Sequence, residues 1–168
     1  MRLAALGLGM AIALLAAPAH AQSVKLLGEF RSWTAYSATE STWPVCFALS
    51  KPVSTDPIPD GFTAGWLYLT NRPSEGVANE LNVVAGYTFA PETPAVAIID
   101  GQGFELFTDK DAAWLRDASQ NDALAAALRA GSTVVIEGTS DKGIKITQTF
   151  SLSGATAASR AIADGCAG

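Results

Sequence analysis

Residues 96–107 read VAIIDGQGFELF, and this stretch predicts the fold class of the chain. Two apolar runs, at 96–99 and 104–107, flank the pair Asp100-Gly101. An Asp-Gly pair between two such runs is a strong sign of a β-hairpin, because glycine accepts the positive φ that a tight hairpin turn needs. The middle of the chain is therefore expected to form antiparallel strands.

Short apolar runs separated by turn residues continue on both sides of this hairpin. A first strand or a pair of short strands is expected at 26–36. Further strands are expected at 45–49, 65–70, 81–89, 133–137 and 144–152, with a proline-containing loop at 54–61. An Ala-rich segment at 121–130 predicts a helix, which Ser119 or Asn121 could cap. Ser153 could cap a second short helix, which is expected to run through Ile162 and to end at Gly165. We predict a mainly β domain, an antiparallel β-sandwich or partly open barrel of about eight strands with two short peripheral helices.

Residues 1–21 have the features of a secretory signal peptide. A positive residue, Arg2, precedes an apolar run of about 15 residues, and Ala19-His20-Ala21 gives the small-x-small pattern of a cleavage site. The alternative, an uncleaved anchor, needs roughly 20 apolar residues to span a bilayer. Cleavage before Gln22 would leave a single domain over residues 22–168 with no integral membrane segment. We expect this domain in the periplasm, with the cell surface or the medium as further destinations.

The composition of residues 22–168 excludes several function classes. Ten basic and sixteen acidic side chains give this part a net charge of −6, which argues against nucleic acid as a partner. The one histidine, His20, lies in the signal peptide, so the exported chain has no imidazole for a catalytic triad or a zinc site. Nucleophile-elbow and phosphate-loop motifs are also absent. We therefore expect no enzyme activity, no cofactor and no metal.

The two cysteines, Cys46 and Cys166, both remain after cleavage. An even number of cysteines in an exported chain favours a structural disulfide. A redox-active thiol is the functional alternative, but it usually needs a second cysteine or a histidine close by. Free thiols and intermolecular pairing of the two cysteines also stay open.

Carboxylates are the remaining candidates for acid–base chemistry. Asp109, Asp111 and Asp117 lie near Trp114 in the sequence. In one interpretation Trp114 is a sugar-stacking platform beside a catalytic carboxylate pair, as in glycosidases. The same carboxylates could bind Ca²⁺, but their spacing is not that of a calcium loop. The interpretation that we favour is a solvated strand end with one buried tryptophan.

The three remaining tryptophans differ in their surroundings. Trp33 and Trp66 lie in strand patterns and are expected in the core. Trp43 lies in a polar Ser-Thr-Trp-Pro segment, which makes it a candidate surface contact.

A series of short motifs follows the signal peptide over nearly the whole chain. They are Phe30-x-x-Trp33, Cys46-Phe47, Gly103-Phe104-x-Leu106, Asp111-x-x-Trp114, residues 124–131, GTSDKG at 138–143 leading into FSLSG at 150–154, and an Ala-rich end that closes with Cys166. In order and spacing this series resembles the invasion-associated locus B family of exported alphaproteobacterial proteins. Three positions depart from the residues common in that family, namely Lys142, Ile144 and Gln148.

The resemblance implies an exported β-rich domain, associated in pathogens with entry into host cells, and it supplies no catalytic residues. Our leading hypothesis is a non-enzymatic binding or structural protein of the periplasm or envelope, whose partner is an envelope or host protein. A small envelope hydrolase that uses carboxylates on glycan or cell-wall substrates is the second hypothesis. A host-surface adhesin is the third, and it predicts an exposed aromatic or apolar patch.

Overall fold

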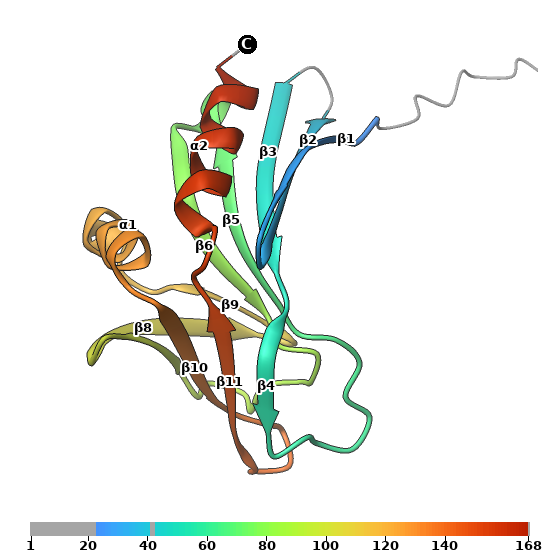
Figure 1. The fold of residues 1–168 in the computed structure, drawn as a ribbon. Helices are drawn as coiled ribbons and strands as arrows, with labels where there is room; N and C mark the ends of the chain where they lie inside the picture. Colours follow the sequence, from blue (N-terminus) through green and yellow to red (C-terminus); the bar gives the residue numbers. More distant parts are fainter. Residues whose placement is uncertain (1–22, 41–42, 168) are drawn as a thin grey trace, which may run out of the picture.

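The computed structural model describes residues 23–40 and 43–167, so the predicted signal peptide and its cleavage site lie outside the described residues. This part of the chain forms eleven strands and two α-helices (Figure 1). The strands are β1 (Lys25–Phe30), β2 (Trp33–Glu40), β3 (Trp43–Ser50), β4 (Pro52–Asp56), β5 (Trp66–Arg72), β6 (Val77–Val84), β7 (Ala95–Ile99), β8 (Gln102–Asp109), β9 (Ala112–Leu115), β10 (Thr133–Thr139) and β11 (Lys145–Ser151). The helices are α1 (Asn121–Ala130) and α2 (Ala155–Cys166), and two 3₁₀ turns are η1 (Pro73–Glu75) and η2 (Ala118–Gln120).

All eleven strands belong to one antiparallel sheet. Its order is β1-β2-β3-β5-β6-β9-β8-β7-β10-β11-β4, and it is not closed, since β1 and β4 are its two edges. Only Lys51 separates β3 from β4, so the chain passes directly from one part of the sheet to its far edge (Figure 1). The prediction of a mainly β fold is confirmed. The expected count of about eight strands is not confirmed, because the described residues form eleven. Of the two expected architectures, the sandwich is not confirmed either, because all eleven strands belong to one sheet that is not closed.

Two strands lie where the sequence predicts none. Residues 52–56 overlap the start of the expected loop, yet they form β4, where Pro52 is tolerated because the strand lies at the sheet edge. The polar residues around Trp114 give no strand pattern in the sequence, yet residues 112–115 form the short strand β9. The expected strand at 81–89 ends at Val84, and Gly86 has a φ of 77° in the loop that follows.

The central hairpin and the first helix agree with the prediction. β7 and β8 pair across Asp100 and Gly101, which both have positive φ, at 49° and 83°. Helix α1 spans the expected residues, but no side chain caps its first turn. Asp117 caps η2 instead, because its carboxylate accepts a hydrogen bond from the Ser119 N–H at 2.9 Å.

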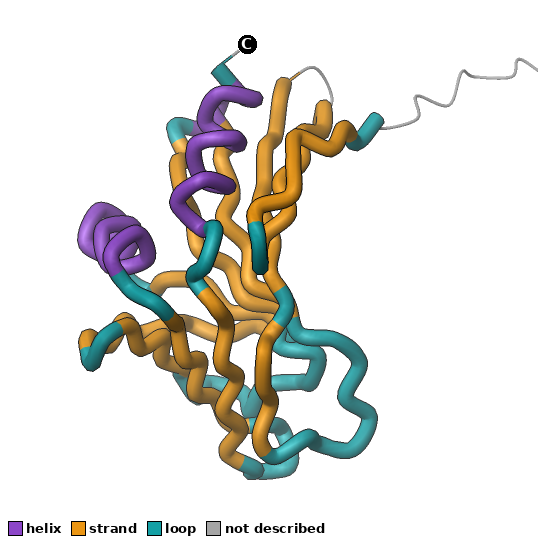
Figure 2. The backbone as a smooth tube through the Cα atoms, in the orientation of Figure 1, coloured by secondary structure: helices purple, strands orange, loops and turns teal. Residues whose placement is uncertain are grey.

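Helix α2 lies against the sheet, and α1 lies beside it (Figure 2). Helix α2 continues beyond Gly165, where it was expected to end, up to Cys166. Gly165 faces Leu27 of β1, and a Cβ at this position would lie 2.6 Å from the Leu27 side chain. The missing side chain thus lets the last turn of α2 approach β1 closely. The buried residues of α2 are Ala155, Ala158, Ile162 and Cys166.

Two links join the N-terminal strands to the C-terminal segment. The predicted disulfide is present between Cys46 of β3 and Cys166 of α2, with 5.8 Å between the Cα atoms. Trp33 is 1% exposed, as expected for a core residue, and its indole N–H donates to the Ser151 carbonyl at 2.9 Å. The core of the domain therefore depends on contacts between residues more than a hundred positions apart. No helix in the described part of the chain is long and apolar enough to cross a membrane.

Candidate functional site on the outer face of the sheet

The strands β2, β3 and β5 carry large side chains on both faces. On the inner face, which packs against α2, alternate residues such as Ala35 and Cys46 are fully buried. The intervening residues point to the outer face, where Tyr36, Phe47 and Tyr68 are only half-buried. Both α1 and α2 contribute to the inner core, so we call the opposite side of the sheet the outer face.

Aromatic rings on neighbouring strands lie side by side on this outer face. Tyr36 stacks on Phe47 with 5.4 Å between ring centres, and Phe47 lies 6.3 Å from Tyr68. Partial burial in this row raises the pKa of the Tyr68 hydroxyl. Trp66 also points outward, and the Lys51 ammonium lies over its ring, 4.9 Å from the ring centre. The expectation that Trp66 fills the core is therefore wrong, because it alternates with the buried Leu67.

A second aromatic pair lies further along the same face. Trp114 of β9 pairs in register with Asn82 of β6 on one side and with Phe107 of β8 on the other. The Phe107 and Trp114 rings are stacked, 5.5 Å apart with an angle of 20° between their planes. Trp114 is half-buried, while Phe107 is 41% exposed. These two rings form one wall of an open cavity of about 430 Å³, which we call the Trp114 pocket.

Carboxylates lie in the Trp114 pocket, and none of the described residues that line it is basic. Glu80 forms an ion pair with Arg72, which also binds Glu75. Asp109 is exposed and forms no ion pair with any residue that the structure describes. The pocket thus keeps one uncompensated negative charge beside a stacked aromatic pair.

The three predicted carboxylates do not come together. Asp109 lines the Trp114 pocket, whereas Asp111 lines a different cavity. Asp117 lines neither cavity, and its hydrogen bonds to Ser119 lower the pKa of its carboxyl. All three side chains are exposed. No group of three or more His, Cys, Asp or Glu residues in the described part of the chain could hold a metal ion.

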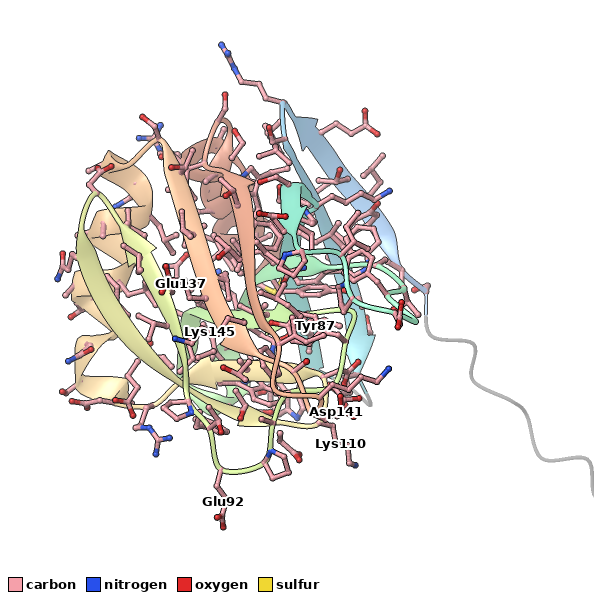
Figure 3. All side chains as sticks on the ribbon, turned by 90° about the horizontal axis from the view of Figure 1, so that it is seen from below. Tyr87, Glu92, Lys110, Glu137, Asp141 and Lys145 are labelled. Atoms are coloured by element: carbon pink, nitrogen blue, oxygen red, sulfur yellow. A yellow bond between two sulfur atoms is a disulfide. The ribbon has the colours of Figure 1, made fainter. Side chains whose placement is uncertain are left out.

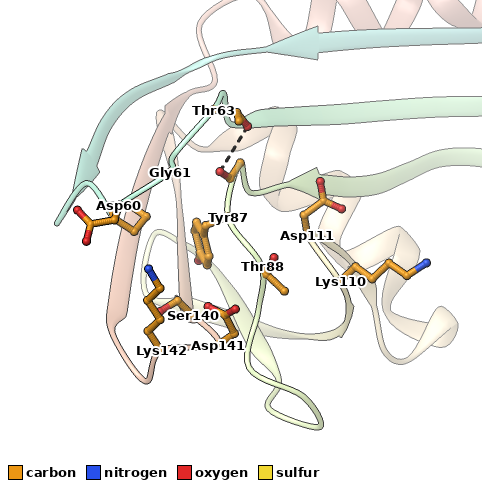
Figure 4. A pocket seen from close by; sticks show the side chains of 12 residues that line it. Asp60, Gly61, Thr63, Tyr87, Thr88, Lys110, Asp111, Ser140, Asp141 and Lys142 are labelled. Atoms are coloured by element: carbon orange, nitrogen blue, oxygen red, sulfur yellow. Dashed lines mark hydrogen bonds between the residues drawn. The ribbon is translucent and has the colours of Figure 1, made fainter.

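The cavity that Asp111 lines is formed by loops at one end of the molecule and measures about 480 Å³ (Figure 4). Lys110, Asp141 and the buried Tyr87 are among the residues that line it, and Figure 3 shows these three near one another. Burial raises the pKa of Tyr87 to about 12, and its hydroxyl has no hydrogen-bond partner among the described residues. The charges around this cavity are of both signs, so it does not select one sign of ligand charge. No local pattern predicts it, because its loops are far apart along the chain.

Trp43, the candidate surface contact, is 61% exposed at the start of β3. Its exposure allows the predicted role, which stays a prediction. Sequence reasoning misses Tyr36, Phe47 and Phe107, because an aromatic residue in a strand pattern is more often a core residue. Alternation along each strand, as in Cys46-Phe47, could have assigned these rings to one face of the sheet, but it does not tell which face is the core.

Comparison with known proteins gives one informative match. No family model and no curated protein sequence matches the chain. Among solved structures, invasion associated protein B from Bartonella henselae superimposes with a TM-score of 0.55 over 81% of this chain and 94% of its own. The fold is similar to that of invasion associated protein B. The sequence identity is 16%, so the likeness to the Bartonella protein establishes the fold alone. The resemblance inferred from the motif series is thereby confirmed at the level of the fold.

Proposed function

We propose that this chain is an exported, non-enzymatic protein of the bacterial envelope, which binds an envelope or host protein through the outer face of its sheet. The observation that carries the proposal is the set of outward aromatic side chains on neighbouring strands. They are Tyr36, Phe47, Trp66, Tyr68, Phe107 and Trp114. Aromatic residues of this kind are enriched where proteins bind one another.

The exposed residues at the margin of this face support the same function. Leu26 of the edge strand β1 lies opposite Tyr36 and is 52% exposed, and Trp43 is 61% exposed. Large exposed apolar side chains that lie together are typical of interaction sites rather than of ordinary monomer surface. The fold likeness to a protein named for invasion makes a host protein one class of partner, as the adhesin hypothesis requires.

A small envelope hydrolase is the second candidate, and the Trp114 pocket is the place where it would act. A glycosidase needs two carboxyl groups facing the scissile bond, one of which must hold its proton. The two carboxylates of the pocket are Asp109, which is exposed, and Glu80, which is already engaged by Arg72. Asp111 and Asp117 lie outside the pocket. This arrangement favours binding over hydrolysis.

Site-specific photo-crosslinking in living cells tests the proposal. A photo-reactive residue replaces Phe107 or Trp43 on the outer face, and the matched control replaces Glu92, which is exposed in the loop before β7. We expect a discrete adduct with one protein at the first two positions and no adduct at the control. Equal adducts at all three positions, or none on the outer face, would contradict the proposal. Turnover of cell-wall glycans that Asp109→Asn abolishes would establish the hydrolase instead.

A further inference from the structure

We propose that the Trp114 pocket binds a cationic side chain, arginine or lysine, of the protein partner. This inference rests on the proposed function and names the chemistry by which the outer face would recognise its partner. It is carried by the stacked pair of Phe107 and Trp114 together with the carboxylate of Asp109.

The aromatic wall is held in place by the sheet. Phe107 and Trp114 are directly opposite each other on β8 and β9, and their nearly parallel rings support one another. The face of an aromatic ring attracts a cation through its quadrupole, most strongly in the case of tryptophan. Because strands position both rings, the binding surface exists before a ligand arrives, which lowers the entropic cost of binding.

The charges around the pocket select a positive ligand. Arg72 compensates Glu80, and Arg116 compensates the nearby Glu105, whereas Asp109 has no partner among the described residues. Asp122, in the first turn of α1, is a further exposed carboxylate next to the pocket residue Asn121. An anionic group, such as a phosphate or an acidic sugar, would be repelled at this position. A guanidinium or ammonium group would interact favourably with both the Asp109 carboxylate and the face of the Trp114 ring.

The chain itself shows this interaction elsewhere on the outer face. The Lys51 ammonium lies 4.9 Å from the centre of the Trp66 ring. The Trp66 ring is therefore already in contact with a cation. Trp114 has no cation over its ring from the described residues. The cavity of about 430 Å³ falls within the range of roughly 300–1,000 Å³ that small-ligand sites occupy, so it admits a complete arginine side chain.

Peptide titration followed by heteronuclear NMR of the purified chain tests the inference. The probes are a capped Gly-Arg-Gly peptide, the same peptide with lysine, and the same peptide with citrulline, a neutral analogue of arginine. A neutral trimer of N-acetylglucosamine is the fourth probe. We expect the two cationic peptides to shift the Trp114 indole N–H signal with a dissociation constant on the order of 1 mM. Their binding should weaken as salt is added, and the citrulline peptide should not bind.

Matched variants locate the effect in the pocket. Asp109→Asn should lower the affinity for the arginine peptide by about 3- to 5-fold, the effect of one exposed charge. Trp114→Ala should lower it about 10-fold, and Phe107→Leu, at an exposed position, provides a second variant if Trp114→Ala does not fold. Asp111→Asn and Glu92→Gln are the controls, since neither residue lines the pocket. Both controls should bind the peptide as the unaltered chain does.

The remaining outcomes separate the two proposals. Equal binding of the citrulline and arginine peptides overturns the inference, as does binding of the trisaccharide alone, which would make the pocket a glycan site. If no probe binds while the Phe107 position still crosslinks to a protein, the proposal of a cationic ligand is wrong and the proposed function stands. If the arginine peptide binds but no outer-face position crosslinks in cells, the pocket chemistry stands and the proposed protein partner is wrong.

Discussion

Removal of the disulfide between Cys46 and Cys166 is expected to lower the free energy of unfolding by about 5 kcal/mol. The two residues are 120 positions apart, so the bond closes nearly the whole domain into one loop. In the chain-entropy relation, a crosslink over a loop of this length restricts the unfolded chain by about 5 kcal/mol at 25 °C. In a domain of this size that loss corresponds to a decrease in Tm of about 10–20 °C.

The structure adds a local consequence in α2. The helix is held against the sheet by Ala155, Ala158, Ile162 and Cys166. Alanine buries little area, and each buried CH₂ group contributes only about 0.8 kcal/mol. Ile162 is the one large apolar residue in this set, so the disulfide is the main restraint on the last turn. Without it, the amide protons near the C-terminal end of α2 should lose protection from hydrogen exchange before those of the sheet.

The assay compares the unaltered chain with the double variant Cys46→Ala/Cys166→Ala. Urea unfolding gives the free energies, and hydrogen exchange with mass spectrometry gives the local protection of α2. The control is the unaltered chain in the presence of a reductant, because it loses the disulfide without the cavities that the two substitutions leave. Its free energy of unfolding should agree with that of the variant to within about 1 kcal/mol. A loss below about 1.5 kcal/mol, or unchanged exchange in α2, would refute this reasoning.

Four further substitutions test separate parts of the fold. Gly154→Ala should cost about 3–5 kcal/mol in urea unfolding, because φ is 96° and the new Cβ would overlap the Phe30 carbonyl oxygen. Gly143→Ala, with a similar φ but open space around it, should cost only about 1–2 kcal/mol. Trp33→Phe should cost about 2–3 kcal/mol, since it leaves the carbonyl acceptor on β11 without its indole donor. The pKa of Tyr87 is raised from 10.0 to about 12, so its neutral form stabilises the fold fully below pH 10 and this contribution is lost as the pH rises to 12. Tyr87→Phe should remove that part of the alkaline loss, measured by urea unfolding across this pH range.

Local sequence signals predict the elements that depend on local contacts. The Asp100-Gly101 turn needs only residues that accept positive φ, and helix α1 needs only its Ala-rich segment. Strand β4 cannot be predicted in this way. Its residues include Pro52, and it becomes a strand because β11, more than ninety positions away, pairs with it at the sheet edge. Whether such a segment is a strand or a loop depends on a partner that the local sequence does not contain.

The sequence does not predict the candidate site, for a different reason. In β2, β3 and β5 both faces carry apolar residues, so alternation alone does not tell which face is the core. Where α2 packs on β2 and β3, the inner residues are small, although Trp33, Leu67 and Leu69 are large side chains on the same face. The inner face is occupied by small residues such as Ala35 and Ala48 where α2 packs closely, and the larger rings of Tyr36 and Phe47 are left outside. Large side chains are expected in a core, but at Ala35 and Ala48 the close helix leaves room only for small ones.

The same packing explains why a partner would use the outer face. Helix α2 covers the inner side of β2, β3 and β5, and the disulfide from Cys46 fixes it there. A partner of the proposed kind would therefore meet the sheet on the side of Phe47, the next residue of the same strand, and of the Trp114 pocket beyond it. Since β5 and β6 separate β9 from the disulfide-bonded strand β3, arginine-peptide binding to the pocket should persist in the Cys46→Ala/Cys166→Ala variant under conditions where its sheet stays folded. Loss of binding together with loss of α2 protection would instead mean that the outer face depends on the helix behind it.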